Sequence, residues 1–206
     1  MTKVEVEHRG LLTGKKFKEL NRTLKKNGKF LEEKDRFSVI YSSRGKETFK
    51  LGRSKIDLKL RITNKKTELV LKYGRWSGND ARKEFLFSID SKKFEEAVEF
   101  LQILGYYYGV LQATKTYIYK YKGVELALVK VPGWGHYFEV EILTKTSLVK
   151  SADKKIMNVC DKFGLKVVND NDFIKLCESF NERPGFRFNF KKEKFSDIKK
   201  RFIDYF

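Results

Sequence analysis

The feature that most constrains the fold is a series of short segments in which apolar and charged residues alternate. Such segments run from Ile56 to Ile62 (IDLKLRI), from Glu68 to Tyr73 (ELVLKY) and from Lys83 to Ile89 (KEFLFSI). Alternate residues of a strand point to opposite faces of a sheet, so each segment predicts a strand with one apolar and one polar face. The stretches TNKK and GRWSGND between them are typical of turns, which indicates hairpin connections.

The rest of the chain continues this pattern and adds helices. Further strands are predicted at residues 3–9, 32–42, 108–121, 124–131 and 136–143, and helices at residues 14–27, 92–104 and after residue 147. Hairpin-connected strands with inserted helices describe an α+β domain built on an antiparallel sheet. Because about eight strands are enough to close around a small ligand, we expect an eight-stranded antiparallel β-barrel with flanking helices.

The length of 206 residues allows one generous domain, or one domain with a small appendage. We expect the barrel domain at residues 1–165 and a helical extension packed on the same domain at residues 166–206. The tail mixes aromatic and basic residues, a combination that can also contact RNA. We favour a packed amphipathic helix there, because Phe195, Ile198 and Phe202 share one face.

The charge of the chain indicates a polyanionic partner. Forty-five Lys and Arg residues face 27 Asp and Glu residues, which gives a formal net charge of +18. Such an excess attracts nucleic acid, nucleotides, polyphosphate or an acidic membrane, and charge alone does not choose among them. The sequence has neither an apolar run that could span a bilayer nor a signal-peptide core. Cys160 and Cys177 fit neither a zinc pattern nor a disulfide framework, so we expect reduced thiols and a cytoplasmic location.

Two pairs of glutamates lie on predicted strands at opposite ends of the barrel pattern. Glu5 and Glu7 alternate with valines in the first strand, and Glu139 and Glu141 alternate with Phe138, Val140 and Ile142 in YFEVEIL. If the sheet closes, these strands are neighbours and the four carboxylates share one wall. Mg²⁺ and Mn²⁺ prefer carboxylate and water oxygens, so the pattern predicts a site for either ion. The alternative is a solvent-facing side of an edge strand.

Basic residues alternate in the same way on the other predicted strands. Lys59 and Arg61 share a face with Asp57, Lys72 shares one with Glu68, and Arg82 shares one with Glu84. A barrel with this lining would bind several phosphate groups at once, through Arg9, Lys59, Arg61, Lys72 and Arg82. The alternative is the wet face of a half-buried sheet. A divalent metal beside a basic lining is suited to phosphoryl or nucleotidyl transfer.

The order of these motifs resembles a known family. The first strand reads Glu5-Val6-Glu7-His8-Arg9, and the closing segment at 131–141 reads VPGWGHYFEVE. Together they resemble the CYTH domain of the triphosphate tunnel metalloenzymes, whose N-terminal strand reads Glu-x-Glu-x-Lys. The basic strands of that family have counterparts, in order, at Lys59-Leu60-Arg61, Leu69-Val70-Leu71-Lys72 and Arg82-Lys83-Glu84. The resemblance covers roughly residues 3–143 and extends over the helix that follows.

The chain departs from the pattern of the family at three places. Arg9 replaces the usual lysine of the first strand. The strand Ala113-Thr114-Lys115-Thr116-Tyr117 has Lys115 where the family commonly has a basic pair. The next strand reads Leu128-Val129-Lys130, without the aspartate that the family often has after the leucine.

The resemblance implies a β tunnel that binds a triphosphate together with Mg²⁺ or Mn²⁺. It implies a metal-dependent triphosphate phosphohydrolase acting on inorganic tripolyphosphate or on an organic or nucleoside triphosphate, with RNA 5′-triphosphate as a further partner. Two alternatives stay open: a class IV-type adenylyl cyclase that makes cAMP from ATP, and a non-catalytic binder of nucleotides, polyphosphate or RNA. Relatives are often dimeric, so a homodimer is also expected, and no membrane partner is.

The resemblance also assigns roles to individual residues. The expected metal ligands are Glu5, Glu7, Glu139 and Glu141. The expected substrate ligands are Arg9, Lys59, Arg61, Lys72, Arg82 and Lys115. Glu84 is expected to bind metal or to orient water, and Arg9 and Lys72 are expected to act with it in catalysis.

Overall fold

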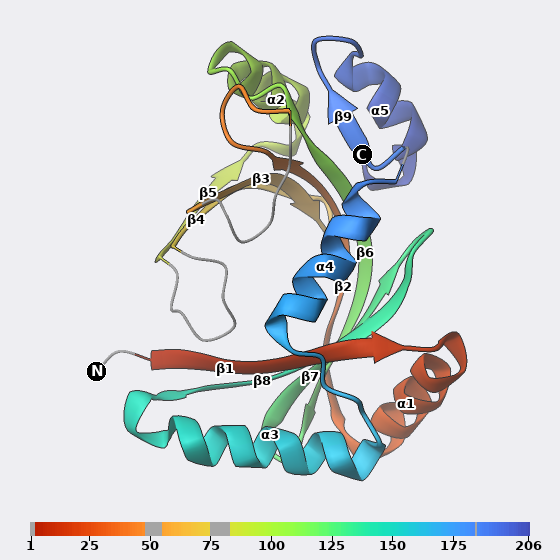
Figure 1. Cartoon of the computed structure of the whole chain (residues 1–206). Coiled ribbons are helices and arrows are strands. Elements are labelled where there is room, and N and C mark those ends of the chain that lie inside the picture. The colour runs from red at the N-terminus through yellow and green to blue at the C-terminus, as the bar shows by residue number, and fades with distance from the viewer. Residues whose placement is uncertain (1–2, 48–54, 75–82, 184) are drawn as a thin grey trace. The chain divides into compact units, whose positions relative to one another are not determined.

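The computed structural model describes residues 3–47, 55–74, 83–183 and 185–206 (Figure 1). The strands are β1 (Lys3–Leu12), β2 (Lys29–Tyr41), β3 (Ile56–Thr63), β4 (Lys66–Tyr73), β5 (Lys83–Ile89), β6 (Tyr108–Tyr121), β7 (Val124–Val131), β8 (Gly135–Lys145) and β9 (Arg187–Asn189). The α-helices are α1 (Gly14–Asn27), α2 (Phe94–Ile103), α3 (Val149–Phe163), α4 (Asp170–Asn181) and α5 (Phe195–Arg201). Short 3₁₀ turns lie at η1 (Ser91–Lys93), η2 (Thr146–Leu148) and η3 (Ile203–Tyr205).

The strands form one antiparallel sheet. Eight of them follow the order β1-β8-β7-β6-β2-β3-β4-β5, and β9 pairs with β6 beside this path. The first and last long strands of the sequence pattern, β1 and β8, pair over ten residues, from Lys3 opposite Lys145 to Leu12 opposite His136. The predicted α+β fold, an eight-strand antiparallel sheet with flanking helices, is confirmed. Among the described residues, no helix has the length and apolar character needed to cross a membrane.

The chain divides into two compact units, each drawn from separate stretches of sequence. Among the described residues, the first unit comprises 3–34 and 114–173, and the second comprises 35–47, 55–74, 83–113, 174–183 and 185–206. The expected division at residue 165 stays a prediction. The two units are not divided at residue 165, because residues after 165 belong partly to the first unit and partly to the second.

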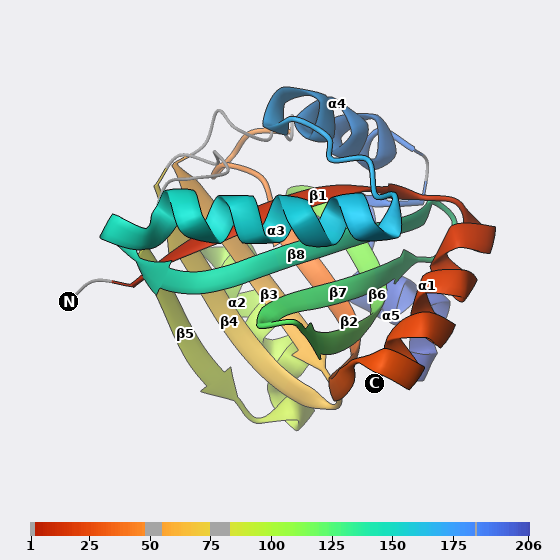
Figure 2. The ribbon, with the colours of Figure 1, turned by 90° about the horizontal axis from the view of Figure 1, so that it is seen from below.

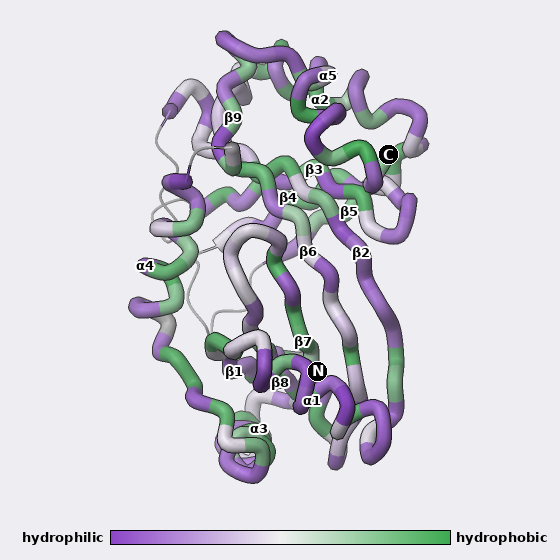
Figure 3. Tube along the Cα trace, turned by 90° about the vertical axis from the view of Figure 1, so that its right-hand side faces the viewer, coloured by the Kyte–Doolittle hydropathy of each residue, from purple (hydrophilic) through white to green (hydrophobic). Residues whose placement is uncertain are grey.

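The core of the first unit lies between one face of its strands and two helices. Helix α1 begins after Thr13, whose hydroxyl accepts a hydrogen bond from the backbone N–H of Lys16. The helix is mostly hydrophilic, with hydrophobic residues recurring at helical spacing (Figure 3). The buried members of this core on α1, β1, β8 and α3 include Phe17, Leu20, Leu24, Val6, Phe138, Val140, Ile156 and Val159. Figure 2 shows α3 lying along β1 and β8, which it contacts.

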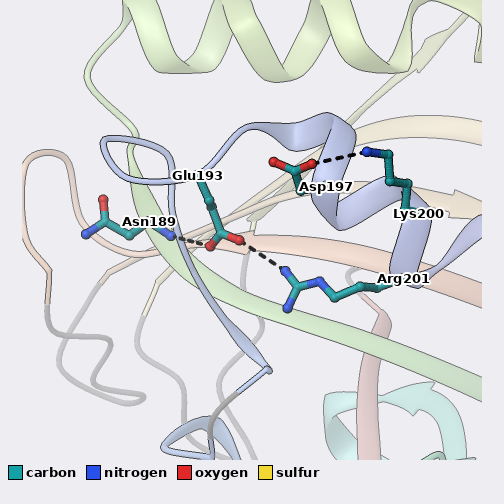
Figure 4. A network of polar contacts seen from close by, with 5 residues as sticks. All are labelled: Asn189, Glu193, Asp197, Lys200 and Arg201. Carbon is teal, nitrogen blue, oxygen red and sulfur yellow. Dashed lines mark hydrogen bonds and ion pairs between the residues drawn. The ribbon is translucent and has the colours of Figure 1, made fainter.

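The core of the second unit lies between β2, β3 and the helices α2 and α5. Its buried members on these elements include Phe37, Val39, Tyr41, Leu58, Leu60, Ile62, Phe94, Val98, Leu101, Phe195 and Ile198. The predicted apolar face of the tail is confirmed, because Phe195 and Ile198 are buried and Phe202 packs against them. Polar contacts hold the residues between β9 and α5: the Glu193 carboxylate accepts hydrogen bonds from the Asn189 backbone N–H at 3.0 Å and from the Arg201 guanidinium at 3.1 Å (Figure 4).

Candidate metal and phosphate site

The predicted acidic pairs lie on one face of the β1–β8 ladder. In the register of the two strands, Glu7 lies directly opposite Glu141, and Arg9 lies directly opposite Glu139. The residues Val6, Phe138 and Val140, which alternate with them, face the other way, into the core of the first unit. Burial of that apolar face under α1 and α3 therefore fixes the register that brings the carboxylates together.

Three of the four predicted metal ligands form a compact cluster. Glu5, Glu7 and Glu141 each offer a carboxylate oxygen, and these atoms lie within 4.8 Å of one another. Three oxygens at this spacing fit a hard divalent cation, since Mg²⁺ and Mn²⁺ are bound by carboxylates and water. The carboxylates of Glu5, Glu7 and Glu141 therefore suit the Mg²⁺ or Mn²⁺ ion that the sequence predicts.

The fourth predicted ligand, Glu139, lies in a mixed environment beside Arg9. The Arg9 guanidinium donates a hydrogen bond to the Glu7 carboxylate. It also lies 4.9 Å from the centre of the Phe173 ring, close enough for a cation–π contact. Burial raises the pKa of Glu139 to about 7, and the negative charge of Glu7 adds to this, whereas Arg9 opposes it. Arg9 thus places a positive charge beside two carboxylates: it is hydrogen-bonded to Glu7 and lies opposite Glu139 in the strand register.

The crowding of negative charge is strongest at Glu141. Burial raises the pKa of its carboxyl to about 8. The negative charges of Glu5, Glu125 and Glu7 act in the same direction. Without a cation among them, these carboxylates repel one another, so a bound divalent ion would favour their ionised forms.

Glu125 on β7 is the acidic residue of this face that the motif comparison missed. It lies directly opposite Glu141 in the β7–β8 register, so Glu7, Glu141 and Glu125 form a row across three strands. Val129, where the family pattern expects an acid, lies on the same face of β7, four residues further along. The alternation of β7 could have identified Glu125, because positions 125, 127 and 129 share a side.

The second unit carries a face on which cations and carboxylates are paired. Arg61 lies opposite Glu68, and its Nε lies 2.7 Å from a Glu68 oxygen. Lys72 lies opposite Glu84, and its Nζ lies 3.1 Å from a Glu84 oxygen. A third pair joins Lys59 to Asp57 of the same strand at 3.0 Å. The predicted basic face is therefore a mixed one, whose apolar opposite side packs in the core of this unit.

Of the two remaining predicted phosphate ligands, the structure describes Lys115. Arg82 lies outside the described residues. Lys115 lies opposite Lys130, on the face of β6 that also carries Tyr117, whereas Glu125 and Glu141 occupy the other face. The Lys115 ammonium lies 2.7 Å from a carboxylate oxygen of Glu33. The structure therefore does not bring Lys115 to the acidic cluster.

No protein-family model and no curated protein sequence matches the chain. Several solved structures do. A conserved hypothetical protein from Pyrococcus furiosus aligns with a TM-score of 0.62 at 26% identity, covering 80% of this chain and 94% of the other. A Vibrio parahaemolyticus protein assigned as an adenylate cyclase gives a TM-score of 0.59 at 17% identity, with 81% and 91% covered.

A third solved structure adds an activity to the comparison. It is a Hippeastrum protein assigned as an adenylyl cyclase, for which a dominant triphosphatase activity is described. Its TM-score is 0.58 at 15% identity, covering 89% of this chain and 98% of the other. These likenesses agree with the resemblance carried by the paired Glu-x-Glu strands, and the chain has the fold of the CYTH domain.

Proposed function

We propose that the chain is a Mg²⁺- or Mn²⁺-dependent enzyme that hydrolyses a triphosphate. The observation that carries this proposal is the cluster of Glu5, Glu7 and Glu141, with carboxylate oxygens within 4.8 Å of one another on a single sheet face. A purely structural role is a poor account of this cluster, because crowded carboxylates destabilise a fold unless a cation lies among them.

The residues of the first unit would hold the metal and bind phosphate. Glu5, Glu7 and Glu141 are the proposed ligands, with Glu125 and Glu139 beside them. A divalent cation bound there would supply positive charge to the phosphate oxygens as the P–O bond breaks. Arg9 is fixed by the Glu7 carboxylate and by the Phe173 ring, so its guanidinium is held ready to bind phosphate.

Lys59, Arg61 and Lys72 of the second unit are the further proposed phosphate ligands. Each is ion-paired to a carboxylate of its own face, and the Lys59, Arg61 and Lys72 side chains are each only partly exposed. Partly exposed pairs are weak, so a phosphate chain that carries several negative charges can displace a single carboxylate. Glu84, released from Lys72 in this way, is the proposed group that orients the attacking water or binds metal.

Hydrolysis is preferred over cyclisation because the Hippeastrum protein of the same fold has a dominant triphosphatase activity. The second candidate, an adenylyl cyclase that makes cAMP from ATP, is favoured by the names of the fold relatives. A binder without catalysis, for nucleotides, polyphosphate or RNA, would use the same carboxylates and cations. The products of ATP and tripolyphosphate separate these three functions.

The test is incubation with tripolyphosphate or ATP, each with Mg²⁺ or Mn²⁺, followed by separation of the products. We expect phosphate release from at least one substrate, and we expect Glu7→Gln to reduce it by at least 100-fold, about 2.7 kcal/mol of lost transition-state stabilisation. Glu99→Gln, an exposed change on α2, is the matched control and should leave turnover unchanged. Cyclic AMP as the main product would move the protein to the cyclases, and binding without any product would contradict both enzymes.

A further inference from the structure

Helix α1 carries a band of positive charge that the proposed catalytic function does not use. Its exposed cations are Lys15, Lys18, Arg22, Lys25 and Lys26. At 100° per residue they fall within an arc of about 100° on the helix surface. Glu19 is the single acidic residue of the helix, and its carboxylate is already bonded to Lys16 at 3.1 Å.

This arrangement works against the stability of the helix. Lys18 and Arg22 are four residues apart, and Arg22 is three and four residues from Lys25 and Lys26. Like charges at these spacings face each other on a helix and repel. A solvated helix face usually alternates acidic and basic residues at such positions, so the uninterrupted band is better suited to an anionic partner.

An exposed aromatic ring lies beside the same helix. The side chain of Phe30, at the start of β2, is 49% exposed. Its ring centre lies 5.5 Å from that of Tyr119, and the Tyr119 hydroxyl donates a hydrogen bond to the Asn21 side chain of α1 at 2.5 Å. Lys29, next to Phe30, is exposed as well. The surface therefore combines a row of cations with one accessible ring.

The burial pattern of α1 argues against a membrane as the partner. A helix that binds in a membrane interface inserts its apolar face into the lipid. In α1 that face consists of Phe17, Leu20 and Leu24, and all three are buried in the core of the first unit. The cations would have to bind lipid headgroups by charge alone, which leaves the exposed Phe30 without a role.

We propose that the cationic face of α1, with Lys29 and Phe30, is a docking surface for single-stranded nucleic acid. Lysine and arginine bind successive phosphates, and an exposed ring stacks on an unpaired base; this combination is typical of proteins that bind single strands without sequence preference. RNA and single-stranded DNA share this chemistry, and the test below includes both.

This surface is separable from the carboxylate cluster. The core residues Val6 and Phe138 lie on the face of β1 and β8 that packs with α1, whereas Glu7 and Glu139 alternate onto the other face. Changes to the exposed side of α1 therefore leave the cluster intact. Failure of the proposed hydrolysis would not count against nucleic-acid binding, and the reverse also holds.

The experiment measures the affinity of the full chain for 20-nucleotide RNA and DNA strands and for the corresponding duplexes, between 0.05 and 0.3 M salt. The test variant replaces Lys18, Arg22 and Lys25 by Gln, which keeps helix propensity. The matched control replaces three exposed cations of α3, Lys150, Lys154 and Lys155, by Gln. Both variants lose three positive charges, so only the location of the charge differs.

The α1 variant is expected to bind single strands on the order of 100-fold more weakly at 0.1 M salt, with a salt slope smaller by about 2, since about 0.7 of a counterion is released for each phosphate contact. The α3 variant should retain wild-type affinity. Phe30→Ala should weaken binding to single strands without changing the salt slope, and should leave duplex binding unchanged.

Equal loss in the two triple variants would overturn the proposal, because it would mean attraction by net charge alone. If Phe30→Ala bound single strands as tightly as the wild type, the proposed stacking of an unpaired base on Phe30 would be overturned. A third measurement uses vesicles rich in phosphatidylserine. If the chain bound these vesicles more tightly than any nucleic acid, and if the α1 variant lost this binding, the partner of the surface would be a membrane and not nucleic acid.

Discussion

At the scale of single residues, the unusual feature of the molecule is a group of glutamates that lie close together on one face of the sheet. Glu7, Glu141 and Glu125 form a row across β1, β8 and β7. Such a row raises the electrostatic energy of the ionised protein unless something positive is bound, and Arg9 offsets only the part near Glu7 and Glu139. The same residues therefore make the metal-free protein sensitive to pH.

The metal-free chain should lose stability as pH rises from about 4.5 to 8. An unfolded carboxyl releases its proton near its ordinary value of 4.5, whereas the pKa of Glu141 in the folded chain is raised to about 8. In this window the folded chain binds more protons than the unfolded chain, so the free energy of unfolding falls with increasing pH. Below this window the carboxyl is protonated in both states, so the free energy of unfolding no longer changes with the titration of Glu141 and is at its highest with respect to this group.

Thermal unfolding in a chelator, followed across this pH range, checks the prediction. Glu141→Gln should flatten the pH dependence, because the amide does not titrate, and Glu99→Gln should leave it as in the wild type. A saturating divalent cation should raise the melting temperature most at high pH. A stability that increases steadily between pH 5 and 8 in the chelator would contradict the electrostatic account of the cluster.

The Tyr41 hydroxyl gives a second residue-scale prediction. Tyr41 is 2% exposed, and its hydroxyl has no hydrogen-bond partner among the described residues. A buried hydroxyl without a partner costs about 1–3 kcal/mol of desolvation, so Tyr41→Phe should raise the free energy of unfolding by about 1 kcal/mol or more. Urea denaturation measures this change.

The matched control for Tyr41 is Tyr119→Phe. This change removes the hydrogen bond to Asn21 and should lower the free energy of unfolding by about 1 kcal/mol. If Tyr41→Phe destabilised the chain by as much as Tyr119→Phe, the Tyr41 hydroxyl would have a partner in solution.

At the scale of elements, sequence alternation predicted the strands well and the sheet faces in part. The segment from Ile56 to Ile62 became β3, where Leu58, Leu60 and Ile62 are buried as the alternation predicts. The segment from Lys83 to Ile89 became β5, but the apolar face predicted for it is not buried, because Phe85, Leu86 and Phe87 are exposed. Glu125 was not predicted, because the family pattern has its acid at the position of Val129, four residues further along β7. The ion pairs of Lys59, Arg61 and Lys72 depend on which strands are neighbours, and only the folded sheet settles that.

The packing of β1 against the segment after α3 depends on Gly10. A Cβ atom at Gly10 would lie 2.0 Å from the carbonyl oxygen of Lys166 and 2.8 Å from the Phe138 ring. The neighbouring Arg9 carbonyl accepts a hydrogen bond from the Val168 N–H at 2.9 Å, which keeps the two backbones close. Because this segment cannot move without breaking that bond, Gly10→Ala should cost about 1–3 kcal/mol of stability.

Gly14→Ala is the control for this prediction, since the nearest atom to a Cβ there is a His136 ring carbon at 3.8 Å, an ordinary contact distance. It should be neutral or slightly stabilising, because alanine is the better helix former. Denaturation curves of the two variants compare them directly. Equal stability of both would mean that the segment around Lys166 and Val168 does not lie against β1.

At the scale of the whole molecule, the fold was predictable and the activity only by class. Paired Glu-x-Glu strands at the two ends of a hairpin-rich pattern indicated the CYTH domain, and the solved structures of that fold agree. The choice between hydrolysis, cyclisation and binding does not follow from the arrangement of the strands, since all three use the same triphosphate ligands. The net charge of +18 is likewise a property of the whole chain. Part of this positive charge lies on the exposed face of α1.

A Mn²⁺ titration of the full chain, with free Mn²⁺ followed by electron paramagnetic resonance, tests whether the glutamate cluster binds a divalent cation. The account predicts saturable binding by the wild type and by Glu99→Gln. It also predicts at least a tenfold loss of affinity in Glu141→Gln, about 1.4 kcal/mol. Equal Mn²⁺ affinity in Glu141→Gln and the wild type would contradict a metal site at Glu5, Glu7 and Glu141.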